Sequence, residues 1–144
     1  MHAYFVILRA NVNSHKLCTY YLEQRIIMTI KNVVVIGAGT MGNGIAHTFA
    51  QFGYDVTLVD VSTEAVHRGL TTIEQNLGRQ AKKGIITEDL KLETIARIKP
   101  STSLVEAASN ADLIIEAASE NVDIKTSLFK TADAICPPHT IFAS

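Results

Sequence analysis

Cysteine and net charge are both scarce in this sequence. Its 144 residues include two cysteines, Cys18 and Cys136, which lie far apart and match no metal or redox spacing. They predict plain thiols in a reducing compartment. Lysine and arginine number 13 against 14 acidic residues, for a formal net charge of −1. Such a chain has no broad basic field for nucleic acid or an anionic membrane surface, so we expect any bound phosphate to be held locally.

Long apolar runs and proline are also in short supply. The longest apolar runs, Tyr4–Leu8 and Val33–Ile36, are strand-sized, whereas a membrane span needs roughly 18 residues or more. We therefore expect no membrane segment. Only 3 prolines and a hydrophobic content of 47% exclude collagen-like and disordered classes and are typical of one globular domain.

Residues 1–27 differ from the rest, because they contain no glycine and show no sustained helical or strand period. We interpret them as an extension that precedes a domain at residues 28–144, with Met28 as the natural start. A mitochondrial transit peptide and an ordered arm are the alternatives. The expected location is cytoplasmic, or the mitochondrial matrix if the extension is a transit peptide.

From Met28 onward, short β-branched runs alternate with longer amphipathic stretches, which is the pattern of a parallel sheet with helices on both faces. The expected fold class is α/β, a Rossmann-type doubly wound parallel sheet truncated in its fifth strand at Ser144. Strands are expected at 32–36, 55–59, 97–99, 113–117 and 140–144, and helices at 41–52, 63–83, 88–96, 103–108 and 121–135. In the last helix we expect Ile124, Leu128, Ala132 and Ile135 to face inward.

A glycine-rich loop joins the first expected strand to the first helix. It reads Gly37-Ala38-Gly39-Thr40-Met41-Gly42, the G-x-G-x-x-G fingerprint of dinucleotide binding in its usual context. The first glycine permits a tight turn, the second lets the backbone approach a pyrophosphate, and the third allows close helix–strand packing. The helix N-terminus would hold the pyrophosphate charge. A purely structural glycine turn is the alternative.

Asp60 lies at the end of the second expected strand, where the fingerprint places an acid. Its carboxylate can accept a hydrogen bond from a ribose 2′-hydroxyl and repels a 2′-phosphate. The next residues, Val61 and Ser62, offer no arginine to offset that repulsion. The sequence therefore predicts NAD rather than NADP as the cofactor.

Four stretches carry a more specific signal: VVVIGAGTMGNGIAHTFAQFGYDVTLVD, NLGRQAKKG, ADLIIEAASEN and CPPHTIFAS. They resemble the 3-hydroxyacyl-CoA dehydrogenases, particularly the 3-hydroxybutyryl-CoA type. The resemblance implies an NAD-binding domain, followed in the complete enzyme by a helical domain that completes the active site and forms a homodimer. It also implies NAD-dependent oxidation of (S)-3-hydroxyacyl-CoA to 3-oxoacyl-CoA in fatty acid and butanoate metabolism.

By this resemblance, Glu120 and Lys125 match family positions beside the nicotinamide half of the cofactor. Asn76 and Lys83 match positions that contact the coenzyme A part of the substrate. Each pair also has a plain structural interpretation. An acid suits a helix start, and basic residues suit a helix end, for electrostatic reasons alone.

None of the five histidines, which are His2, His15, His47, His67 and His139, matches the family's catalytic histidine. The resemblance places the catalytic His–Glu pair and a substrate-contacting serine beyond Ser144, and no metal is expected. We therefore expect this chain to bind NAD but to be inactive alone. A free-standing NAD-binding module and a dehydrogenase acting on other hydroxy acids or sugar acids are the alternatives.

The glycine loop yields a direct test. We expect Gly39→Val to abolish NAD binding while the fold survives, because a branched side chain would occupy the place of the pyrophosphate. Calorimetric titration with NAD measures the loss, and circular dichroism checks the fold. Undiminished NAD affinity would refute the assignment of the loop.

Overall fold

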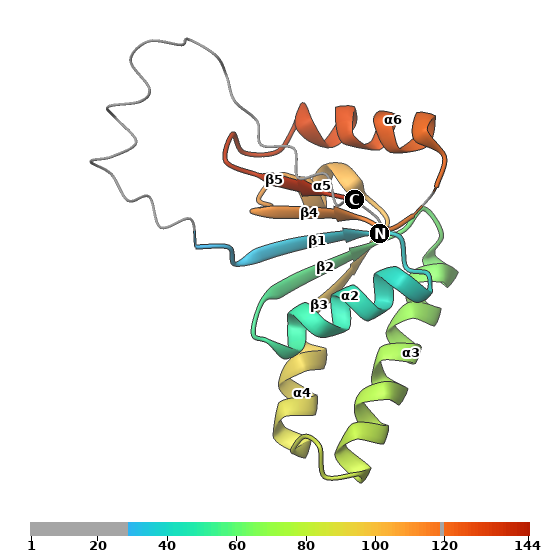
Figure 1. Ribbon diagram of the computed structural model, residues 1–144, viewed down its shortest axis with the longest axis vertical. Helices are drawn as coiled ribbons and strands as arrows, with labels where there is room; N and C mark the ends of the chain where they lie inside the picture. The colour runs from blue at the N-terminus through green and yellow to red at the C-terminus, as the bar shows by residue number, and fades with distance from the viewer. Residues whose placement is uncertain (1–28, 119) are drawn as a thin grey trace, which may run out of the picture.

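A computed structural model describes residues 29–118 and 120–144, so the expected extension at 1–27 lies outside the described residues. Five parallel strands form one sheet in the order β3-β2-β1-β4-β5 (Figure 1). The strands are β1 (Asn32–Ile36), β2 (Asp55–Val59), β3 (Ile98–Ser101), β4 (Leu113–Glu116) and β5 (Ile141–Ala143). This topology confirms the predicted α/β doubly wound fold.

Helices cover both faces of the sheet (Figure 1). They are α2 (Thr40–Gln51), α3 (Thr63–Lys82), α4 (Glu88–Ala96), α5 (Leu104–Ala108) and α6 (Val122–Asp133). Helices α2, α3 and α4 lie on one face, and α5 and α6 on the other. Because all neighbouring strands are parallel, their carboxyl ends lie at the same edge of the sheet. Helices α3 and α4 together connect β2 to β3 and extend beyond the sheet as a pair (Figure 1).

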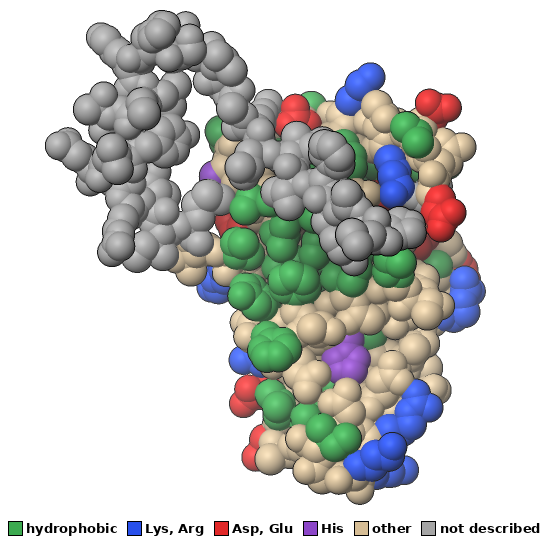
Figure 2. Space-filling model, in the orientation of Figure 1, with side chains coloured by type: hydrophobic (Ala, Val, Ile, Leu, Met, Phe, Trp, Pro, Cys, Tyr) green, Lys and Arg blue, Asp and Glu red, His purple; other side chains and the backbone are tan. Residues whose placement is uncertain are grey.

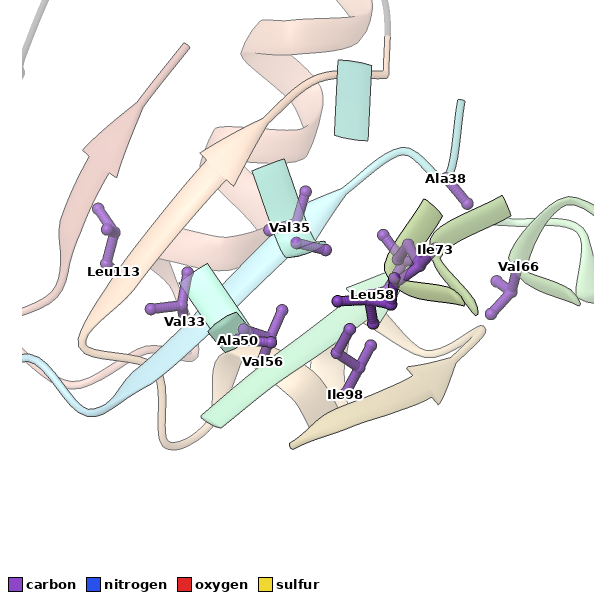
Figure 3. Close-up of a cluster of buried hydrophobic side chains, with 12 residues drawn as sticks. Val33, Val35, Ala38, Ala50, Val56, Leu58, Val66, Ile73, Ile98 and Leu113 are labelled. Carbon is purple, nitrogen blue, oxygen red and sulfur yellow. The ribbon is translucent and has the colours of Figure 1, made fainter. Parts of the chain in front are cut away.

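The central strand β1 is buried on both sides. Val33 and Val35 belong to the core beneath α2 and α3, which Figure 3 shows together with Leu58 and Ile73. Val34 and Ile36, which alternate with them, pack in a second core beneath α5 and α6. A strand enclosed in this way requires a continuous apolar run, which explains why its bounds could be predicted without error.

Two expectations need correction. Strand β3 was expected to end before Pro100, but it continues to Ser101. Within residues 29–118 and 120–144 it lies at the edge of the sheet and pairs with β2 alone, so a proline without an N–H is tolerated there. In α6, Ile124 was expected to face inward but is 48% exposed, because this helix reaches the core through Leu128, Phe129 and Ala132, in its second half.

His47 is a buried titratable group on α2. Its side chain lies in the interior with the residue only 8% exposed, and Nε2 has no hydrogen-bond partner among the described residues. Burial lowers the pKa of His47, and a hydrogen bond with Gln51 offsets part of that effect. The folded chain therefore resists protonation of this imidazole more strongly than the unfolded chain does.

We expect the free energy of unfolding to fall as the pH drops below about 6.5, because the unfolded chain then takes up a proton at His47 that the folded chain resists. His47→Gln should flatten this part of the pH profile, whereas His67→Gln, at an exposed position of α3, should leave it intact. Urea unfolding between about pH 5 and pH 8 measures both. Identical profiles for the wild type and His47→Gln would contradict this expectation.

Candidate functional site

The glycine loop leaves the carboxyl end of β1 in a conformation that requires glycine at its first position. Gly37 has φ +102°, and its N–H donates to the Val59 carbonyl at 2.7 Å. A Cβ at Gly37 would lie 2.7 Å from Ala118 Cα and 2.8 Å from the Ala117 carbonyl oxygen. The loop is thus clamped between the ends of β2 and β4.

Gly42 and Gly39 are required for different reasons. A Cβ at Gly42 would lie 1.7 Å from the carbonyl oxygen of Gly37, so α2 can pass over the loop only if this position is glycine. A Cβ at Gly39 would meet no atom within 4 Å. It would instead extend into open space at the start of α2, which is where a pyrophosphate would approach the backbone.

The N-terminus of α2 differs from those of the other described helices. The residues that precede helices α3, α4, α5 and α6 cap them with side chains that accept a hydrogen bond from the first turn; these N-caps are Ser62, Thr87, Ser103 and Asn121. The N-cap of α2 is Gly39, which has no side chain to accept such a bond. Its first backbone N–H groups, together with the positive end of the helix dipole, suit an anionic ligand.

Asp60 connects the loop to the start of α3. One carboxylate oxygen accepts the Ala38 N–H at 2.8 Å, and the other accepts the Ser62 N–H at 3.3 Å. Beside it lies a hollow of about 300 Å³, lined by residues 38–40, Asn43 and Asp60 and by side chains of α3. The structure thus brings the predicted loop residues Ala38, Gly39 and Thr40 together with Asp60, whereas Met41 points outward and is 69% exposed.

Sequence reasoning missed Arg68, which lines the same hollow as Asp60. The expectation that no arginine lies near Asp60 rested on Val61 and Ser62 alone, and Val61 is in fact almost fully exposed. The other α3 residues at the hollow are Ala65, Gly69 and Thr72. With Arg68 they follow the i, i+3, i+4, i+7 spacing of one helix face, so the signal lay in helical periodicity.

A second polar cluster lies at the carboxyl end of β4. The side chain of Glu116 is fully buried, and its Oε2 lies 3.3 Å from Nζ of the predicted residue Lys125. Ser144 Oγ completes the cluster, because it accepts from Lys125 at 3.0 Å and donates to Glu116 at 3.1 Å. Glu116 was also missed, although a single acid at the end of an apolar strand was a usable signal, because a buried carboxylate needs partners.

The other predicted residues lie apart from the hollow. Glu120 is exposed and directly precedes Asn121, the N-cap of α6. Asn76 lies on α3 about 12 Å further along the helix axis than Arg68, at 1.5 Å per residue, and accepts a hydrogen bond from Arg79. Lys83 is the C-cap of the same helix. Figure 2 shows basic side chains gathered at this far end of α3.

Residues 29–118 and 120–144 hold neither a membrane-spanning helix nor a cluster of metal ligands. No helix there is long and apolar enough to cross a membrane. No three histidine, cysteine or acidic side chains in that part of the chain gather into a possible metal site.

Residues 32–144 match the family model described as "3-hydroxyacyl-CoA dehydrogenase, NAD binding domain". The chain is 50% identical over 117 residues to a probable 3-hydroxybutyryl-CoA dehydrogenase of Bacillus subtilis, covering 81% of this chain and 40% of that protein. It is 39% identical to the human mitochondrial hydroxyacyl-coenzyme A dehydrogenase, covering 80% of this chain and 38% of the relative. The chain thus spans about 40% of the length of these relatives.

Solved structures agree with these relatives. The (S)-3-hydroxybutyryl-CoA dehydrogenase of Ralstonia eutropha superposes with a TM-score of 0.75 at 43% identity, over 79% of this chain and 40% of that one. The uncapped start of α2, the open space before Gly39 and the braced Asp60 carboxylate fit a bound dinucleotide. The chain belongs to the 3-hydroxyacyl-CoA dehydrogenase family as an NAD-binding domain, and its cofactor is NAD.

Proposed function

We propose that this chain supplies the cofactor-binding part of an enzyme that oxidises (S)-3-hydroxyacyl-CoA to 3-oxoacyl-CoA. One observation carries the proposal: the uncapped start of α2 lies beside an Asp60 carboxylate that is hydrogen-bonded to the glycine loop. Bound NAD would accept the hydride from C3 of the substrate. The acyl-CoA substrate is taken from the relatives, since those of Bacillus subtilis and Ralstonia eutropha are named for 3-hydroxybutyryl-CoA.

In this proposal the chain binds and orients the cofactor. Backbone N–H groups at residues 37–42 hold the pyrophosphate, and Asp60 accepts a hydrogen bond from the adenosine ribose. Lys125 and Glu120 flank the nicotinamide half beyond the end of β4. The helix dipole and these local groups supply the binding, which explains how a chain with a net charge of −1 can hold a pyrophosphate.

We infer that acid–base catalysis comes from residues outside this domain. Of the described histidines, His47 is buried on α2 and His67 is exposed on α3. His139 pairs with Asp112, the residue that precedes β4. His139 and Asp112 thus lie at the amino end of the strands, opposite the glycine loop. The homodimer and the cytoplasmic or mitochondrial location stay predictions from the sequence.

The proposal is tested by titrating the 144-residue chain with NAD and by incubating it with NAD and (S)-3-hydroxybutyryl-CoA. We expect saturable binding of NAD and no formation of NADH, because positioned acid–base groups commonly contribute about 10²–10⁴-fold to the rate. Absorbance at the NADH band follows the reaction. An absence of NAD binding would overturn the proposal. Rapid turnover would overturn the inference that acid–base catalysis comes from residues outside this domain.

Discrimination between NAD and NADP should depend on two side chains at the hollow. We expect Asp60→Ala to weaken NAD binding by roughly tenfold and to relax the rejection of NADP, because the acceptor for the 2′-hydroxyl and the repulsion of the 2′-phosphate are both lost. With Asp60 removed, Arg68 can pair with the 2′-phosphate, so Asp60→Ala combined with Arg68→Gln should lose the gained NADP affinity. Calorimetric Kd values for both cofactors measure this. An unchanged NAD/NADP ratio in Asp60→Ala would count against the ribose role.

Contact with coenzyme A should depend on the far end of α3. Reversing the charges of Lys82 and Lys83 to glutamate should weaken the binding of an acyl-CoA ester roughly tenfold, because its phosphates lose their cationic partners. NAD affinity should not change. The same double reversal at Lys99 and Lys130, which are exposed on other elements, is the matched control. Equal acyl-CoA affinity in all three proteins would contradict the assignment of Lys83 to the substrate site.

A further inference from the structure

The ion pair between Glu116 and Lys125 is held from several directions. Glu116 Oε1 accepts the Ala118 N–H at 2.7 Å, so the carboxylate fixes the start of the loop that follows β4. Its Oε2 receives both the Lys125 ammonium at 3.3 Å and the Ser144 hydroxyl at 3.1 Å. The Glu116 side chain is 0% exposed and that of Lys125 is 32% exposed. The carboxylate is therefore buried in the interior, whereas the ammonium lies between the carboxylate and the surface.

This ion pair lies on one side of the glycine loop and Asp60 on the other. Glu116 pairs in register with Ile36, the residue that precedes Gly37, and Gly37 packs against Ala117 and Ala118. Asp60 follows β2, on the opposite side of β1. A dinucleotide with its pyrophosphate at the loop and its adenosine half at Asp60 must extend its nicotinamide half across the end of β4.

The charge of the nicotinamide ring makes its position beside the Glu116–Lys125 ion pair important for cofactor affinity. The oxidised nicotinamide ring carries one positive charge that the reduced ring lacks, whereas the remainder of the cofactor is unchanged. An isolated ammonium beside the ring would therefore disfavour NAD⁺ relative to NADH. A carboxylate bonded to that ammonium cancels most of this field, and burial keeps the cancellation from being screened by salt.

We propose that Glu116 is a positioning residue that fixes the Lys125 ammonium and compensates its charge, and so sets the relative affinity of the domain for NAD⁺ and NADH. Ser144 assists by bridging the two groups. The inference rests on the proposed cofactor site, and it concerns the ratio of two affinities rather than binding itself. A residue needed only for stability would weaken both forms of the cofactor equally, because they share every group outside the nicotinamide ring.

The test uses the 144-residue chain and calorimetric Kd values for NAD⁺ and NADH. Glu116→Gln keeps the shape of the side chain and removes its charge, and it should weaken NAD⁺ about five- to tenfold more than NADH. Lys125→Gln leaves the carboxylate uncompensated and should shift the ratio in the opposite direction, toward NAD⁺. The double variant should return toward the wild-type ratio.

Controls separate this effect from general damage. Glu93→Gln removes an exposed ion pair with Arg97 on α4 and should leave the ratio unchanged. Circular dichroism identifies any variant that does not fold, and if Glu116→Gln fails, the direction of the shift in Lys125→Gln decides the matter. Equal weakening of both cofactors, or shifts of the same sign in both single variants, would overturn the inference. Failure of the wild-type chain to bind either cofactor would instead overturn the proposed function.

Discussion

The close approach of backbone to backbone around the glycine loop is the constraint on which the rest of the site depends. Helix α2 crosses the loop so tightly that a single methyl group at Gly42 would overlap the carbonyl of Gly37. The same turn has no room for a side chain where it meets Ala118. These contacts fix the start of α2 at the edge of the sheet, and the position of every other candidate group follows from that start.

Two carboxylates brace the backbone on either side of this loop. Asp60 accepts the N–H of Ala38 after β1, and Glu116 accepts the N–H of Ala118 after β4. Arg68 lines the same hollow as Asp60, and Lys125 forms an ion pair with Glu116. The site thus combines uncapped helix amides with two carboxylates that hold the backbone, and it needs no excess of basic residues.

Local patterns predicted the parts of the structure that local forces determine. The glycine spacing and the bounds of β1, β2 and α4 could all be read from neighbouring residues. The hydrogen bond from Ser144 to Glu116 could not, because it depends on β4 and β5 lying side by side. Ile124 was misplaced because periodicity gives the orientation of a helix face but not how far along the helix the sheet extends.

The proline in β3 affects whether a strand of another molecule can pair with this edge of the sheet. The amides of Val56 and Asp60 bond to the carbonyls of Arg97 and Ser101, so the alternate residue Pro100 faces away from β2, along a border of the sheet that pairs with no other described strand. A row of unpaired amides there would invite a strand of another molecule, and intermolecular strand pairing leads to aggregation. Pro100 removes a donor from that row, and the neighbouring Lys99 is exposed. Both features discourage the addition of a foreign strand beside β3.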